Sequence, residues 1–283
     1  GRAARTDDDK RRRVGTASAG NHAQGIALSG SIMDISALIV MPTMTPQIKV
    51  DAVRNFGGEV LLFGDNFDEA KERASEIAQS EGRVFVPPFD DPHVIAGQAT
   101  IGLEIFQQAS TVDRVFVPVG GGGLAAGVAV VLKQLNPRIS VIGVEPEGSA
   151  CLTAAMKAGK PVTLDRVSLY AEGVAVARIG DETFRVCRDN LDEVITVNSD
   201  EISAAVKDIF DDTRAVAEPS GAVALAGLKK YVTTHGVHGE TLAHVLSGAN
   251  LNFHGLRYIS ERAELGELGV ALVGGTIPVR MGA

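Results

Sequence analysis

Several features are scarce or absent in this sequence, and each absence excludes a class of protein. The net charge of −8 leaves no excess of Lys and Arg to neutralise the phosphates of a nucleic acid. No uninterrupted apolar run approaches the roughly 20 residues that span a bilayer. The Arg-rich start, Arg11 to Arg13, lacks the apolar segment of a secretory signal. We therefore expect a soluble, cytoplasmic globular protein that binds neither nucleic acid nor membrane.

Cysteine is also scarce in the chain. The two cysteines, Cys151 and Cys187, have no CxxC spacing and no histidine partner in the sequence. This pattern fits two reduced thiols with a structural role better than a disulfide framework or a zinc site.

What the sequence does contain is a regular alternation of two patterns. Short β-branched runs alternate with helix-periodic stretches such as 66–80 and 200–210, and Asp200 is placed to cap the second stretch. The expected strands are 35–40, 59–63, 83–86, 114–119, 140–144, 193–197 and 242–246. Such alternation predicts parallel α/β sheets. We place a seam at 110–112, which gives domains 1–112 and 113–266, with 267–283 as a tail or the start of a linker.

Four consecutive glycines, Gly120 to Gly123, follow the β-branched run 115–119 and precede a helix-like stretch. Where a strand passes into a helix without side chains, bare backbone N–H groups and the helix N-terminus can close around a phosphate. The simpler alternative is a tight turn with close packing of helix on strand, although one glycine usually suffices for a turn. The glycine run therefore predicts a phosphorylated cofactor.

Two kinds of cofactor fit this run. Gly120, Gly122 and Ala125 satisfy the dinucleotide pattern G-x-G-x-x-A, and Glu145 follows the next strand where a ribose-binding acid would sit, as in an NAD(P)-binding Rossmann protein. A dinucleotide fingerprint normally opens its domain, however, whereas roughly three strand–helix units precede this one. The other alternative, a cofactor with a single phosphate, requires further elements elsewhere.

A second loop, residues 16–25, supplies such an element. It sets small hydroxyl residues and a glycine ahead of a helix, so that the hydroxyls of Thr16 and Ser18 and the backbone N–H groups can grip a carboxylate. Asn21 can offer its amide to a phenolic oxygen. Taken alone, Ser18 or Asn21 could be only a helix N-cap.

Three motifs, in this order, now resemble one family: residues 16–25, Gly120 to Leu124, and the string 247–250. They resemble the pyridoxal-phosphate (PLP) enzymes of the tryptophan-synthase-β fold, specifically the threonine dehydratases with their serine dehydratase and serine racemase relatives. The string 252–258, with 260–262, points more narrowly to threonine dehydratase. The resemblance implies two open, mostly parallel twisted sheets flanked by helices, and a homo-oligomer. It also implies β-elimination of L-threonine to 2-oxobutanoate and ammonia for isoleucine biosynthesis, with a serine dehydratase or serine racemase-like enzyme as the alternative.

The resemblance also implies roles for single residues. Gly120, Gly121, Gly122, Gly123 and Leu124 would bind the PLP phosphate, and Asn21 would bind the ring hydroxyl. Ser247 would face the pyridine nitrogen as a catalytic residue. A neutral hydroxyl does not hold that nitrogen protonated, so the ring would be a weaker electron sink. The implied substrate-binding residues are Thr16, Ser18, Ala19, Gly20, Asn21, His22 and Gly173.

The sequence departs from the family in its lysine. The Ser-Phe-Lys-x-Arg-Gly-Ala-like motif that carries the Schiff-base lysine is absent, and ungapped alignment of 16–25 puts that lysine before Gly1. We nominate none of the lysines present as a substitute, since most lie on stretches typical of solvated helix faces. Either an N-terminal segment lies outside this sequence, or the chain is a non-catalytic PLP-binding fragment. The short tail also leaves no room for the regulatory domain of biosynthetic members.

A site for a divalent metal ion is not expected. Glu145 matches one ligand position of the cation site found in relatives, but Cys151 stands where serine racemases have an acidic ligand. This leaves only a monovalent cation near Glu145 as an open alternative.

Overall fold

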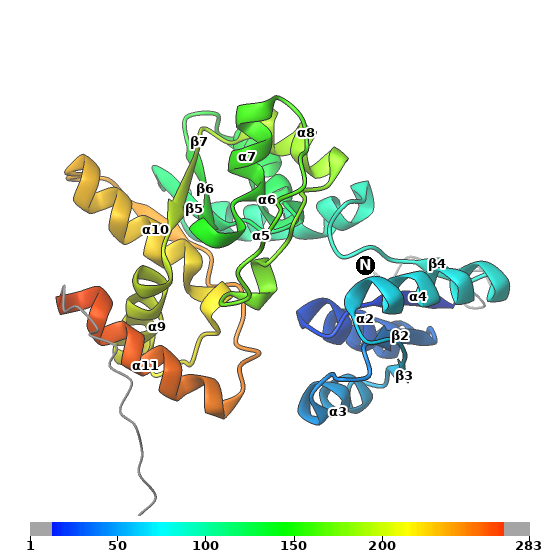
Figure 1. The fold of residues 1–283 in the computed structure, drawn as a ribbon. Coiled ribbons are helices and arrows are strands. Elements are labelled where there is room, and N and C mark those ends of the chain that lie inside the picture. The colour runs from blue at the N-terminus through cyan, green and yellow to red at the C-terminus, as the bar shows by residue number, and fades with distance from the viewer. Residues whose placement is uncertain (1–12, 269–283) are drawn as a thin grey trace, which may run out of the picture.

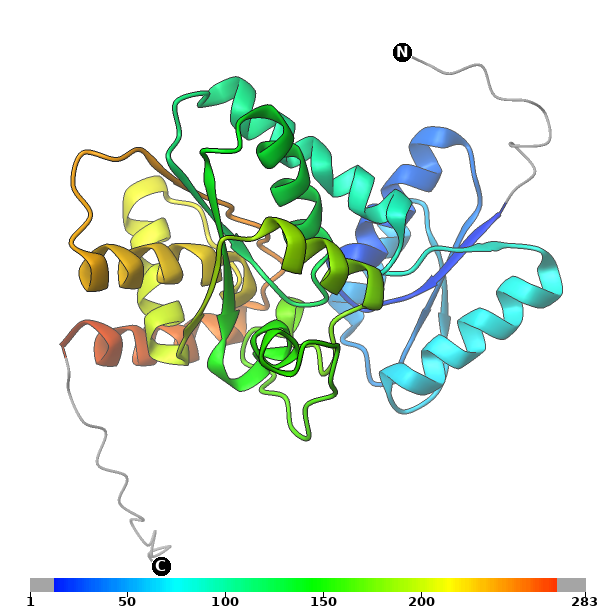
Figure 2. The same ribbon diagram turned by 90° about the horizontal axis from the view of Figure 1, so that it is seen from above.

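The computed structural model describes residues 13–268 and forms two lobes, each built on a four-stranded parallel sheet (Figures 1 and 2). The first sheet has the order β3-β2-β1-β4 and the second β7-β6-β5-β8. The strands are β1 (Val14–Ala17), β2 (Ala37–Met41), β3 (Glu59–Leu62), β4 (Val84–Phe85), β5 (Arg114–Pro118), β6 (Ser140–Pro146), β7 (Glu193–Val197) and β8 (Leu242–His244). The predicted parallel α/β architecture is confirmed.

Three helices cover the first sheet: α2 (Asn21–Met33), α3 (Gln47–Asn55) and α4 (Phe67–Glu81). Because successive side chains of a strand point to opposite faces, Ile39 packs with α2 and α3 while its neighbour Val40 packs with α4. Apolar side chains on both faces explain why the strands read as continuous hydrophobic runs.

The second sheet is also covered on both faces. One core contains α5 (Pro92–Gln108), α6 (Gly123–Leu135), α7 (Cys151–Ala158) and α8 (Asp181–Asn190). The other contains α9 (Ser199–Thr213) and α10 (Pro219–His235), and α11 (Phe253–Leu268) packs along α9. Helix α5 lies N-terminal to the seam predicted at 110–112, yet Ile95 belongs to the core of the second sheet. The chain therefore crosses between the lobes at residues 86–91.

Two details differ from expectation. Strand β1 was not among the predicted strands, because its four residues include Gly15 and form no β-branched run, but it pairs with both β2 and β4 in the middle of the sheet. The cap of α9 is Asn198 and not Asp200. Asn198 Oδ1 accepts the N–H groups of Asp200 and Glu201, so the prediction for Asp200 was wrong by two positions.

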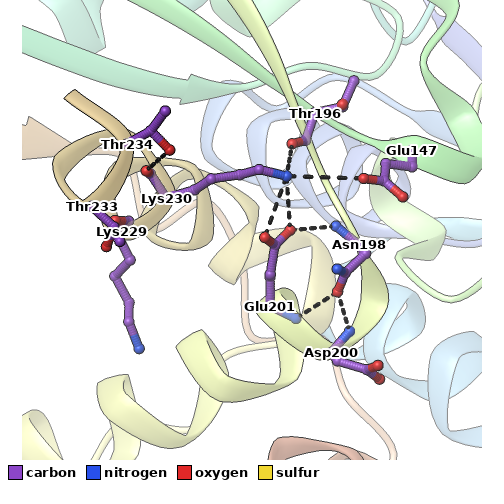
Figure 3. A network of polar contacts seen from close by, with 9 residues as sticks. All are labelled: Glu147, Thr196, Asn198, Asp200, Glu201, Lys229, Lys230, Thr233 and Thr234. Atoms are coloured by element: carbon purple, nitrogen blue, oxygen red, sulfur yellow. Dashed lines mark hydrogen bonds and ion pairs between the residues drawn. The ribbon is translucent and has the colours of Figure 1, made fainter. Parts of the chain in front are cut away.

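The start of α9 is further tied to α10 by Lys230. The Lys230 ammonium donates to the Thr196 carbonyl at 2.9 Å and to the Glu201 carboxylate at 3.3 Å (Figure 3). Glu201 in turn accepts the Asn198 N–H. The contacts fix β7, α9 and α10 relative to one another, so this lysine is a structural residue.

A further prediction concerns the two cysteines. Cys151 and Cys187 are free and buried, as expected for structural thiols. In the described part of the chain, no helix is both long and apolar enough to cross a membrane.

Candidate cofactor and substrate site

The glycine loop joins β5 to α6 in the interior of the second lobe, and Gly120 to Gly123 are buried. Gly122 is the N-cap of α6 and has φ +91°, a left-handed conformation that side chains disfavour. The first hydrogen bond of α6 runs from Ala126 N–H to the Gly122 carbonyl. The amides of Gly123, Leu124 and Ala125 therefore have no partner within the helix, and they lie at its positive end.

The other glycines of the loop are required by close packing. A Cβ on Gly120 would lie 2.8 Å from Val174 Cα, and one on Gly121 would lie 2.2 Å from the Phe89 ring. The simpler alternative, a tight turn with close packing, therefore accounts for glycine at these positions, and it leaves the free amides at the start of α6 without a role. The loop has no side chains and presents the free amides of a helix N-terminus, so it fits a phosphate.

The side chains of Thr16 and His22 point into the first lobe. Thr16 is fully buried in β1, and its hydroxyl donates to the Val86 carbonyl at 2.8 Å. His22 Nε2 lies 3.0 Å from that hydroxyl and 3.1 Å from the same carbonyl. Burial lowers the pKa of His22, against a smaller opposing effect of the Val86 contact, which favours the neutral ring. These side chains hold β1, α2 and the end of β4 together, so only their backbones can serve a ligand.

The segment between them forms the start of α2. Gly20 is the N-cap and has no side-chain cap, while Ser18 Oγ accepts the Gly20 N–H at 3.2 Å. Neither Ser18 nor Asn21 is the N-cap of this helix. The first-turn amides, beginning at Asn21, are thus left for a ligand with negative charge such as a carboxylate.

Residues far apart in the sequence meet between the lobes. Asn21 Nδ2 donates to Glu218 Oε1 at 2.6 Å across 197 positions. Gly248 packs on this pair, because a Cβ there would lie 2.1 Å from Glu218 Oε1 and 2.9 Å from Asn21 Nδ2. The neighbouring Ser247 hydroxyl donates to the Ser220 carbonyl at 3.4 Å. A Cβ on Gly173 would lie 2.6 Å from Ser220 Oγ, so Gly173 belongs to the same group.

Sequence reasoning missed Glu218. Only 8% of this residue is exposed, and burial raises the pKa of its carboxyl, while the hydrogen bonds from Asn21 and Ser220 act in the opposite direction. It directly precedes Pro219 at the start of α10, which is an ordinary helix N-terminus in sequence. No local signal distinguishes it.

Lys49 was also missed. Its ammonium donates to Glu172 Oε2 at 2.7 Å, which links α3 of the first lobe to the 3-10 turn η2 (Glu172–Val174) of the second. The Lys49 side chain is only 15% exposed. Most of the lysines are expected on solvated helix faces, and Lys49 is an exception, because its ammonium meets Glu172 of the second lobe.

Glu145 is unsuited to the role that a dinucleotide site would give it. It is fully buried, and its carboxylate accepts the Leu152 N–H, the Thr153 N–H and the Thr153 hydroxyl at 2.7 to 2.8 Å. Burial raises its pKa, although these hydrogen bonds oppose the rise. The carboxylate thus stabilises the start of α7 and cannot reach a ribose. Across residues 13–268 no group of three or more His, Cys, Asp and Glu is arranged for a metal, and the monovalent cation near Glu145 stays a prediction.

The family "Pyridoxal-phosphate dependent enzyme" matches residues 2–248. The chain belongs to this family. The match confirms the PLP fold and cofactor that the motifs implied and overturns the NAD(P) alternative, whose acid is already engaged in the core.

Known proteins of the family include close relatives of the chain. It is 66% identical over 278 residues to the L-threonine dehydratase biosynthetic IlvA of Escherichia coli strain K12, covering 98% of this chain and 54% of that protein. It is 49% identical to the mitochondrial threonine dehydratase of Saccharomyces cerevisiae, over 93% of this chain and 47% of that protein. The chain spans about half the length of these curated relatives.

Solved structures agree with this placement. The processed form of threonine deaminase isoform 2 from Solanum lycopersicum superposes with a TM-score of 0.89 at 48% identity, covering 92% of this chain and 76% of that one. Maize serine racemase superposes with a TM-score of 0.83 at 31% identity, covering 91% and 79%.

Proposed function

We propose that this chain is the catalytic part of a PLP-dependent ammonia-lyase that converts L-threonine to 2-oxobutanoate and ammonia, in isoleucine biosynthesis. The observation that carries the proposal is the 66% identity to a biosynthetic threonine dehydratase over 98% of the chain. The likeness to a serine racemase is lower, at 31%. Because one methyl group changes specificity by only about 1–3 kcal/mol, L-serine is the competing substrate to test.

The glycine loop supplies the phosphate site in this proposal. The amides of Gly120 to Leu124 would bind the PLP phosphate, and the positive end of α6 adds to the attraction. Since the loop is buried, water competes poorly for these amides.

Asn21 and Ser247 would hold the ring. The Asn21 amide has two N–H groups, of which one donates to Glu218 and the other is left for the ring hydroxyl. Glu218 thereby orients the amide. Ser247 would place a neutral hydroxyl at the pyridine nitrogen. PLP supplies, when bound, the electron-withdrawing ring that stabilises charge at the substrate α-carbon.

The start of α2 would bind the substrate carboxylate. Within the segment Ser18 to His22, the N–H groups of Ser18 and Gly20 are bonded to the Val40 carbonyl and to Ser18 Oγ. The first-turn amides of α2, which begin at Asn21 and His22, would favour an anion without requiring a cationic side chain. Thr16 and His22 hold this segment against Val86, so the carboxylate site is rigid before substrate arrives. Gly173 would approach the substrate from the other lobe.

The test of the proposal is formation of 2-oxobutanoate from L-threonine with PLP present. The 283-residue chain is compared with one extended upstream through the lysine that the family motif carries. We expect PLP binding by both and turnover only by the extended chain, since nucleophilic catalysis and proton transfer need that amine. Inactivity of both would favour a non-catalytic PLP-binding protein.

The same preparation tests PLP binding, with NAD and NADP as negative controls. PLP should raise the melting temperature of the chain, and NAD and NADP should leave it unchanged. Stabilisation by a nicotinamide cofactor alone would refute the PLP site. A homo-oligomer in the cytoplasm completes the proposal, and sedimentation and cell fractionation test these two properties.

A further inference from the structure

Three successive carbonyl groups of the glycine loop each accept a hydrogen bond from a side chain behind the loop. The Gly121 carbonyl accepts from the Thr183 hydroxyl at 2.7 Å. The Gly120 carbonyl accepts from the Cys151 thiol at 3.4 Å, and the Gly122 carbonyl, which also accepts the Ala126 N–H at 2.9 Å, accepts from the Cys187 thiol at 3.6 Å. All three donor residues are fully buried.

The donors come from two helices that meet behind the loop. Cys151 is the first residue of α7, whereas Thr183 and Cys187 are one turn apart on α8 and so lie on one face of that helix. The thiols keep their protons at neutral pH, because burial and the nearby Glu145 carboxylate raise the pKa of each cysteine to about 12. Each thiol therefore remains a donor, although a weaker one than a hydroxyl. The Glu145 carboxylate also competes with the Gly120 carbonyl for the proton of the Cys151 thiol.

The position of α8 is itself fixed from the crossing between the lobes. The Asp90 carboxylate accepts the N–H groups of Asp181, Glu182 and Thr183 at 3.0 to 3.1 Å. The preceding residue, Phe89, packs against Gly121 and Gly123. Residues 89 and 90 thus contact both elements: Phe89 packs on the glycine loop, and Asp90 binds the start of α8, the helix that carries Thr183 and Cys187.

The consequence concerns the direction of the loop's dipoles. The N–H and C=O of a trans peptide unit point to opposite sides. Glycine tolerates most backbone dihedrals, so a loop of four glycines has little intrinsic preference for which group faces a ligand. A carbonyl turned toward a phosphate would repel it, while a carbonyl bonded to a donor behind the loop leaves the adjoining amide on the ligand side.

We infer that Thr183 and Cys151 are positioning residues that hold the carbonyl groups of Gly121 and Gly120 away from the cofactor phosphate, and that Cys187 acts together with the Ala126 N–H on the carbonyl of Gly122. The loop amides are thereby preorganised for an anion, and the cysteines serve the site without any thiol chemistry. This inference rests on the proposed function, because it assigns the phosphate of PLP to the loop.

The test compares PLP with pyridoxal, which has the same ring but no phosphate. Thr183→Val keeps the shape of the side chain and removes the hydroxyl, and Thr183→Ser keeps the hydroxyl as the matched control. Affinities of the 283-residue chain for both compounds are measured by equilibrium dialysis. We expect Thr183→Val to weaken PLP binding about tenfold while pyridoxal binding is unchanged, and Thr183→Ser to bind PLP like the unaltered chain.

A second pair, Cys187→Ala and Cys187→Ser, decides the question if Thr183→Val does not fold. The alanine variant should weaken PLP binding by a smaller factor than Thr183→Val, and the serine variant should restore it. Unchanged PLP affinity in the variants that lack a donor, or an equal loss for PLP and pyridoxal, would overturn the inference. Failure of the unaltered chain to bind PLP would instead refute the proposed function, and the inference with it.

Discussion

The packing of Gly248 on the Asn21–Glu218 pair leads to a sharp prediction for Gly248→Ala. The new Cβ would lie 2.1 Å from Glu218 Oε1 and 2.9 Å from Asn21 Nδ2. The first distance is about 1 Å shorter than a normal contact between non-bonded atoms. Glu218 is 8% exposed and bonded to Asn21, so it cannot swing into solvent without losing that bond. Overpacking of this kind costs about 1–3 kcal/mol.

The assay is thermal unfolding with and without PLP. At about 2–4 °C for each kcal/mol, the melting temperature of Gly248→Ala should fall by several degrees. The increment that PLP adds should also shrink, because Asn21 is displaced. Gly97→Ala is the control, since a Cβ at this position in α5 meets nothing within 4 Å and alanine favours a helix.

A double variant tests whether contact with the Glu218 carboxylate causes the loss of stability in Gly248→Ala. In a Glu218→Ala background the carboxylate is gone, so adding Gly248→Ala should cost at least about 1 kcal/mol less than it does in the unaltered chain. If Gly248→Ala costs the same in both backgrounds, or leaves the melting temperature unchanged, the packing described between the lobes is wrong.

Three further predictions concern the same region. Charge reversal by Lys49→Glu or Glu172→Lys should widen the separation of the lobes and the double reversal should restore it, with an effect of at most about 1 kcal/mol because Glu172 is 71% exposed. Spin labels on cysteines introduced at Ser75 and Arg185 measure the distance, because both native cysteines are buried, and equal spectra for all variants would contradict a linking role. Because burial raises the pKa of Glu218, the folded state holds its proton longer than the unfolded state, so this carboxyl makes stability fall as pH rises from the ordinary glutamate pKa through the raised one. Glu218→Gln should remove that part of the fall in the free energy of unfolding, which is measured by urea unfolding between pH 4 and 7. An unaltered dependence of this free energy on pH would count against a raised pKa. In the lysine-containing extended chain, Ser247→Ala should keep PLP bound but slow elimination, by a factor corresponding to about 1–3 kcal/mol for an unpaired ring nitrogen; an unchanged rate and absorption spectrum would show that Ser247 does not contact the ring.

Much of the fold could be predicted because its signals are local. A buried parallel strand is a short β-branched run, so the strands other than β1 were located from composition alone. The four glycines predict a phosphate site, and close packing against Val174 and Phe89 also requires glycine in the loop, so the phosphate site stays a prediction. β1 escaped because its pairing with β2 and β4, and not its composition, makes it a strand.

Local signals also failed at single side chains. The sequence placed Thr16 and His22 in a ligand-binding loop, but Thr16 lies within β1, and its side chain is buried against Val86. The alternation of side chains along a strand follows from register, which depends on the neighbouring strands. The choice between Asn198 and Asp200 as a cap likewise depends on where the preceding strand ends.

By itself, the sequence determined the class of sheet, the glycine loop between a strand and a helix, the order of the three motifs and the family that they imply. Each of these depends on residues that are close together in the chain. Only the tertiary structure decided that Glu218 orients Asn21, that Lys49 meets Glu172 and that Thr183 holds the Gly121 carbonyl. These partners are separated by 62 to 197 positions. The first two contacts join the lobes and exist only after the lobes have packed, whereas the third exists only after α8 has packed behind the glycine loop within the second lobe.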